Sequence, residues 1–196
     1  MKTTLTLPAG YHVIRRVKLS EDKRLSLWLN AAALLLSVGL VLVGLALHPL
    51  DVPVGSPLDI LDMSWPQLLA AICGGVLYIV LHELTHGVMI RLTAKVRPDY
   101  GLSGMFAYAG SRQAYFSRPA YLAVGLAPVV LWGIVLLVLN LTLPADWFWP
   151  VYFIQICNLG GAAGDLYITH LLLFVLPKDV LTMDTGVDMT FYSRTR

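Results

Sequence analysis

Long apolar runs separated by short polar stretches dominate the pattern of this sequence. Each run is long enough to cross the hydrocarbon core of a bilayer, which takes about 20 apolar residues in a helix. The runs occupy residues 25–47, 66–92, 120–143 and 150–176. Ser64 and Pro66 are typical of a helix start, and Pro177 is typical of a helix end. The pattern predicts an all-α integral membrane protein with four transmembrane helices.

The polar stretches between the runs are too short for a separate soluble domain, so we expect a single membrane domain over residues 1–196. Prolines and aspartates in residues 48–64 predict a loop. Residues 93–118 are broken by glycines and contain two short aromatic-rich stretches, which suggests a hairpin-like segment between the second and third helices. Residues 177–196 form a polar C-terminal tail.

Composition and charge agree with this picture. The chain is 57% hydrophobic and 13% charged, whereas soluble domains carry about 25% charged residues. All 14 Lys and Arg residues lie in residues 1–24, 91–118 or 178–196. By the positive-inside rule, both termini and the polar 93–118 segment then lie on the cytosolic side. The basic residues form no sustained run, so we expect the protein to contact the lipid bilayer and not to bind nucleic acid.

The second run contains the sequence His82-Glu83-Leu84-Thr85-His86. Ionisable residues are costly in a membrane helix and are functional candidates for that reason. Positions i and i+4 share one face of a helix, so the two imidazoles come together as a pair of zinc ligands. Glu83 between them is placed to act as the catalytic base that takes a proton from water. A packed polar cluster without metal is the alternative.

Asp165 in the fourth run is the candidate third metal ligand. It follows Pro150 by 15 residues, and His82 follows Pro66 by 16 residues. In helices that enter from the same side, both residues then lie roughly 22–24 Å below the outer surface. A buried acid paired with His170 or an arginine is the alternative. Asn158 shares the helix face of Asp165 and could hold a substrate carbonyl, support a ligand, or join two helices.

These residues resemble the zincin membrane peptidases, small bacterial proteins similar in plan to the site-2 proteases, which are intramembrane zinc metalloproteases. The resemblance rests on the His82–His86 motif, the polar segment after it, Gly164-Asp165, and the tail from Pro177 to Gly186. It implies Zn²⁺ bound by His82, His86 and Asp165, Glu83 as the base, and a bacterial cell membrane as the location. Site-2 proteases usually have Asn-Pro-Asp-Gly at the aspartate, but no proline adjoins Asp165 here.

The expected function is therefore zinc-dependent hydrolysis of peptide bonds in a membrane-anchored protein or peptide, close to the cytosolic side. The 99–118 segment could offer a strand edge that pairs with an extended substrate. Two other functions stay open at this point. The same polar cluster could carry protons or metal ions across the membrane, or the zinc could stabilise a scaffold that catalyses nothing.

Overall fold

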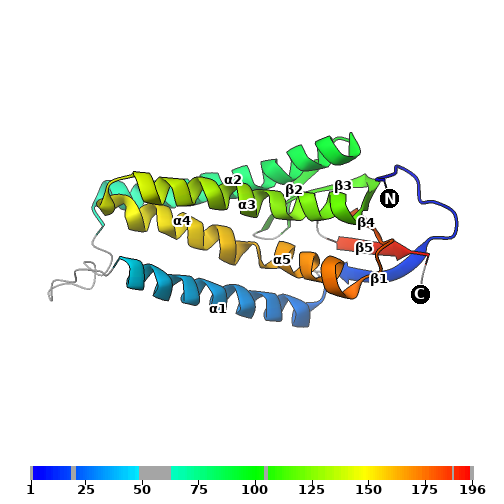
Figure 1. The fold of residues 1–196 in the computed structure, drawn as a ribbon, viewed down its shortest axis with the longest axis horizontal. Helices are drawn as coiled ribbons and strands as arrows, with labels where there is room; N and C mark the ends of the chain where they lie inside the picture. The colour runs from blue at the N-terminus through cyan, green and yellow to red at the C-terminus, as the bar shows by residue number, and fades with distance from the viewer. Residues whose placement is uncertain (1, 19–20, 49–62, 104–105, 187, 195–196) are drawn as a thin grey trace.

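The computed structural model describes residues 2–18, 21–48, 63–103, 106–186 and 188–194. Its helices run side by side along the long axis, and its strands gather toward one end, which we call the sheet end (Figure 1). The helices are α1 (Lys23–Leu47), α2 (Trp65–Ala94), α3 (Arg118–Thr142), α4 (Phe148–Gly161) and α5 (Ala163–His170). Most of the loop predicted at residues 48–64 lies outside the described residues.

Three helices in the described part of the chain, α1, α2 and α3, are long and apolar enough to cross a membrane. Their outer faces expose large apolar side chains, for example Leu35, Val76 and Leu141. Water disfavours such a surface, whereas lipid tails accommodate it. The protein is therefore a membrane protein.

Local signals set the start of α2. The backbone N–H of Ser64 donates to Oε1 of Gln67 at 2.6 Å, which satisfies a group at the helix N-terminus. Gln67 in turn donates through Nε2 to the carbonyl of Asp146 at 2.8 Å. This side chain joins the beginning of α2 to the turn that precedes α4.

The fourth predicted helix is interrupted near its middle. α4 ends at Gly161, α5 begins at Ala163, and a π-helical turn, Leu171–Val175, follows α5. Ala162 between them has a ψ of 15°, which departs from helical geometry. Glycines are poor helix formers, and three of them flank this point: Gly160, Gly161 and Gly164. The break places Asp165 in the first turn of a separate helix.

The prediction of an all-α protein is wrong, because the described residues also form a five-stranded antiparallel sheet with the order β1-β5-β4-β3-β2. The strands are β1 (His12–Lys18), β2 (Asp99–Ser103), β3 (Phe106–Ser117), β4 (Leu181–Asp184) and β5 (Asp188–Ser193). The hairpin predicted within residues 93–118 is present as β2 and β3. The other three strands come from the N-terminal segment and the C-terminal tail.

Pairing between distant segments explains why local patterns missed this sheet. β1 pairs with β5, with His12 opposite Ser193, and β4 pairs with the far end of β3. Strands of four to seven residues carry a weak local signal, and their stability depends on neighbours that the sequence does not identify. The tail therefore looked like a polar extension although it forms a hairpin.

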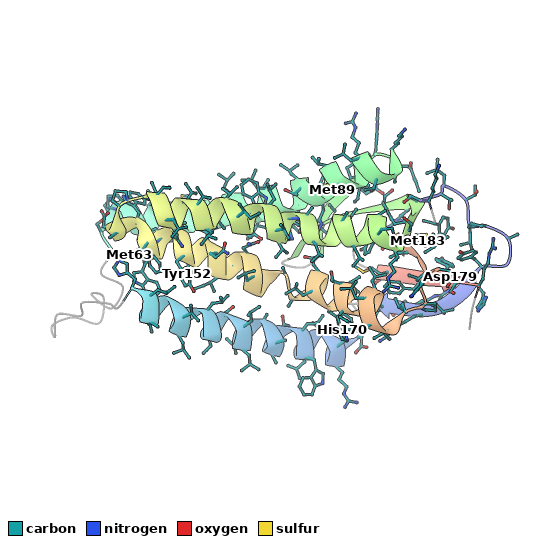
Figure 2. All side chains as sticks on the ribbon, viewed as in Figure 1. Met63, Met89, Tyr152, His170, Asp179 and Met183 are labelled. Carbon is teal, nitrogen blue, oxygen red and sulfur yellow. The ribbon has the colours of Figure 1, made fainter. Side chains whose placement is uncertain are left out.

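Fully buried large side chains concentrate where the sheet meets the helices. They include Ile90 of α2, Phe116 of β3, Leu172 after α5, Leu181 of β4 and Phe191 of β5. Figure 2 shows Met183 and Asp179 at this end, with Met63 and Tyr152 toward the opposite end. The sheet thus packs against the C-terminal part of α2, where the histidine motif lies.

Candidate metal centre

His82 and His86 lie one turn apart on the buried face of α2. Both imidazoles are buried, and their Nε2 atoms are 3.1 Å apart. Residues four positions apart on a helix share a face, so α2 alone brings the two rings together. The pair presents two ring nitrogens to one point.

The carboxylate of Asp165 completes this cluster from α5. Its Oδ2 lies 3.4 Å from Nε2 of His82, and its Oδ1 lies 3.5 Å from Nε2 of His86. One possible ligand atom from each residue lies within 4.8 Å of the others. His170, the alternative partner of Asp165, is exposed, and its ring lies against Phe174. The structure therefore brings together the three residues that the sequence predicts as ligands.

A carbonyl group on α3 orients His86. Nδ1 of His86 lies 2.9 Å from the carbonyl oxygen of Val124. A carbonyl oxygen only accepts hydrogen bonds, so Nδ1 carries the proton and donates it. The neutral ring then keeps a lone pair on Nε2, the nitrogen that faces Asp165.

A relay through Tyr78 and Asn158 orients His82 in the same way. Nδ2 of Asn158 donates to the carbonyl of Val129 at 3.2 Å, which leaves Oδ1 as the acceptor toward Tyr78. The Tyr78 hydroxyl donates its proton to that Oδ1 at 2.8 Å. Because a hydroxyl has one proton, it must accept from Nδ1–H of His82, 2.7 Å away. In the neutral ring, Nε2 of His82 therefore also keeps a lone pair that can bind a metal ion.

The chemistry of this donor set fits a zinc ion. When both rings are neutral with the proton on Nδ1, two nitrogen lone pairs and an ionised carboxylate face one another, which is electrostatically unfavourable. A cation relieves that repulsion. Two histidine nitrogens and one carboxylate oxygen are a ligand set of catalytic zinc sites, which keep a further position for water or substrate. His82, His86 and Asp165 are the residues that would hold the ion.

A cavity of about 670 Å³ opens beside the cluster. Its wall combines residues from all five α-helices, β3 and the tail. Glu83 lines this cavity, and the backbone amide of Ala109 on β3 faces its carboxylate. Ile79, Phe153 and Ile156 add apolar surface. A carboxylate beside the three ligand residues, in a space open to a substrate, is suited to proton transfer.

Asn158 has no free polar atom to offer a substrate. It is fully buried, its two amide atoms are bonded to Tyr78 and Val129, and it is not among the residues that line the cavity. Its position favours a supporting role for His82. Sequence reasoning missed Tyr78, although its place four residues before His82 puts it on the same helix face.

The C-terminal tail supplies another wall of the cavity, through Asp184, Gly186 and Met189. The Tyr121 hydroxyl donates to Oδ2 of Asp184 at 2.6 Å, and the N–H of Gly186 donates to Oδ1 at 2.7 Å. Burial raises the pKa of the Asp184 carboxyl, and these two hydrogen bonds oppose that shift. Sequence reasoning found no role for this carboxylate, because only the folded sheet brings it to the cavity.

The chain matches the model of one protein family, DUF3267, whose description is "Putative zincin peptidase". The match covers residues 75–181, more than half of the chain, and it includes the histidine motif and Asp165. No curated protein and no solved structure matches the chain. Zincins are metallopeptidases that use zinc, in agreement with the ligand set described above. The chain belongs to this family of zincin peptidases.

Proposed function

We propose that this protein is a zinc-dependent peptidase that cleaves membrane-anchored proteins or peptides within the bilayer, near its cytosolic side. The observation that carries the proposal is the convergence of His82, His86 and Asp165 beside Glu83, at the wall of a cavity inside a bundle of membrane helices. The family match supports the peptidase chemistry. The intramembrane location rests on the apolar helices that carry the site.

Each polar group of the centre has a role in this reaction. His82, His86 and Asp165 would hold the zinc ion, which when bound would supply Lewis acidity to acidify a water molecule and polarise a peptide carbonyl. Glu83 takes the proton of the attacking water and passes it to the leaving amine. Val124 and the Tyr78 relay hold the two imidazoles in the required tautomer.

Charge distribution supports the orientation. The 13 Lys and Arg residues that the structure describes lie in segments at the sheet end, and the sequence of residues 48–64 and 144–149 contains none. The positive-inside rule then places the sheet end and both termini in the cytosol, in what we take to be a bacterial cell membrane. His82 and His86 lie in the half of α2 nearer the sheet, so cleavage would occur close to the cytosolic surface.

The sheet supports a mode of substrate binding. A helical substrate hides its carbonyls in its own hydrogen bonds, so the cleaved segment must be extended. Ala107, Tyr108 and Ala109 all line the cavity, although side chains of consecutive strand residues point to opposite faces. A backbone edge of β3 therefore borders the cavity, and the amide of Ala109 faces Glu83. We propose that an extended substrate pairs with this edge.

The test compares metal content and cleavage in three forms of the purified protein, with model membrane-anchored peptides as substrates. The wild type should hold one zinc ion per chain and cleave, and a chelator should abolish cleavage until zinc is restored. Glu83→Gln should keep zinc and lose cleavage, whereas Asp165→Ala should lose zinc. Glu21→Gln is the matched control, because Glu21 is exposed and pairs with Lys18.

Three results would contradict the proposal. Full cleavage by Glu83→Gln would remove the base assignment. Wild-type protein in liposomes that moves protons or zinc down a gradient, and cleaves no membrane peptide, would identify a carrier. A zinc-bearing protein that neither cleaves nor transports, and is unaffected by Glu83→Gln, would identify a scaffold.

A further inference from the structure

Pro128 lies inside α3, next to the metal centre, and is fully buried. In an α-helix each N–H bonds to the carbonyl four residues earlier, and proline has no N–H. The carbonyl four residues before Pro128 belongs to Val124. It therefore lacks its partner within the helix, and the proline ring pushes it away from the regular position. An unpaired carbonyl in a membrane helix needs a donor from a neighbour.

The donor in this structure is His86 of α2. Its Nδ1–H bonds to the Val124 carbonyl at 2.9 Å, which leaves Nε2 directed at Asp165. The imidazole N–H of His86 on α2 thereby takes the place of the backbone N–H that Pro128 lacks on α3. We propose that Pro128 is a positioning residue of the metal centre: it releases the Val124 carbonyl, which fixes the ring and tautomer of His86. This inference rests on the proposed role of His86 as a zinc ligand.

A second buried proline provides an internal comparison. Pro128 and Pro150 are the fully buried prolines among the large buried side chains of the described residues. Asp146 lies four residues before Pro150, and its carbonyl also accepts a side-chain hydrogen bond, from Gln67 at 2.8 Å. Gln67 precedes His82 by 15 residues on the same helix, which is about 22 Å. Pro150 thus resembles Pro128 in its burial and in the side-chain hydrogen bond to the carbonyl four residues earlier, but it lies in the first turn of α4 and away from the metal centre.

The experiment replaces each proline and measures zinc binding and metal-free stability. Pro128→Ala restores an N–H that competes with His86 for the Val124 carbonyl. Zinc affinity, measured by competition with a chromophoric chelator, should fall about tenfold, as for lost outer partners of other metal ligands. The absorption spectrum of bound Co²⁺ should change as the geometry of His86 relaxes. Pro150→Ala should leave zinc affinity and the Co²⁺ spectrum unchanged.

Metal-free stability separates positioning from ordinary packing. Proline disfavours a helix interior, so metal-free Pro128→Ala should melt no lower than the wild type. Pro128→Val, which keeps more of the buried volume, should show the same loss of zinc affinity. Wild-type zinc affinity in both Pro128 variants would overturn the inference. So would lower metal-free melting temperatures in both, because the proline would then serve the bundle itself.

The same measurements keep this inference separate from the proposed function. If Asp165→Ala loses zinc while both Pro128 variants bind it normally, the role inferred for Pro128 is wrong and the proposed metal centre stands. If Asp165→Ala binds zinc as the wild type does, the proposed metal centre itself is wrong.

Discussion

Removing the hydroxyl of Tyr78 is expected to weaken the metal centre although Tyr78 is not a ligand. The hydroxyl makes two hydrogen bonds, at 2.7 Å with His82 and at 2.8 Å with Asn158. Tyr78→Phe keeps the aromatic ring, which packs edge-on against His82, and deletes both bonds. The variant leaves Nδ1–H of His82 and Oδ1 of Asn158 buried without partners.

The expected size follows from those two unpaired groups. A buried donor or acceptor without a partner costs about 1–3 kcal/mol, so metal-free Tyr78→Phe, with two such groups, should lose about 2–6 kcal/mol of stability. His82 would also be free to turn or to change its tautomer. Loss of such an outer partner typically lowers metal affinity about 10- to 100-fold, or about 1.4–2.7 kcal/mol.

Tyr152→Phe is the matched control. Tyr152 is a buried tyrosine of α4 whose hydroxyl donates to the Leu40 carbonyl at 2.8 Å, toward the end of the bundle away from the sheet (Figure 2). This variant should lose about 1 kcal/mol of stability and keep its zinc affinity.

The assay measures zinc affinity by chelator competition and stability by thermal melting, both in detergent. A zinc affinity in Tyr78→Phe equal to that of the wild type would refute the relay, whatever the change in melting. A rotated His82 should also alter the spectrum of bound Co²⁺, which Tyr152→Phe should not.

Two further predictions concern the sheet end. A side chain at Gly110 would meet the backbone of Gly186, so Gly110→Ala should displace the cavity wall and slow cleavage about 100-fold with zinc retained. Gly39 has open space around it, so Gly39→Ala should change neither the cleavage rate nor the zinc content. Equal cleavage rates in Gly110→Ala and Gly39→Ala would refute the role of this wall. Tyr121→Phe removes a donor from Asp184, whose pKa burial already raises. The ionised carboxylate then loses a partner, so the variant should lose about 1–3 kcal/mol at neutral pH. The loss should shrink as pH falls through the raised pKa of folded Asp184, because the carboxyl is then protonated and uncharged in both folded proteins. Melting temperatures that differ from the wild type equally at all pH values would contradict this.

The pair of candidate metal ligands on α2 was predictable because its geometry is local. The i, i+4 spacing of His82 and His86 is a property of any α-helix, and it holds wherever that helix packs. Asp165 was predictable by a weaker argument, equal depth in two membrane helices. The structure brings the three residues together, although the fourth helix breaks at Ala162, before the aspartate.

The supporting groups were not predictable, because each depends on contacts between elements. Val124 acts through its backbone carbonyl, which no residue type reveals. Tyr78 and Asn158 lie 80 residues apart and meet only when α4 packs against α2. Asp184 reaches the cavity because β4 pairs with β3 and its carboxylate bonds to Tyr121 of α3.

Apolar periodicity and charge bias were sufficient to identify a membrane protein, its long helices and the histidine pair, because these depend on helix geometry and on transfer of side chains into lipid. They were insufficient for the sheet. Its two edge strands are far apart in the chain, in the N-terminal segment and in the 93–118 hairpin. The pairing of its strands depends on long-range contacts, which a local stretch of sequence does not reveal. The folded sheet end therefore adds residues to the cavity wall that no local pattern places there, whereas the sequence pattern alone identifies the residues that could hold a metal.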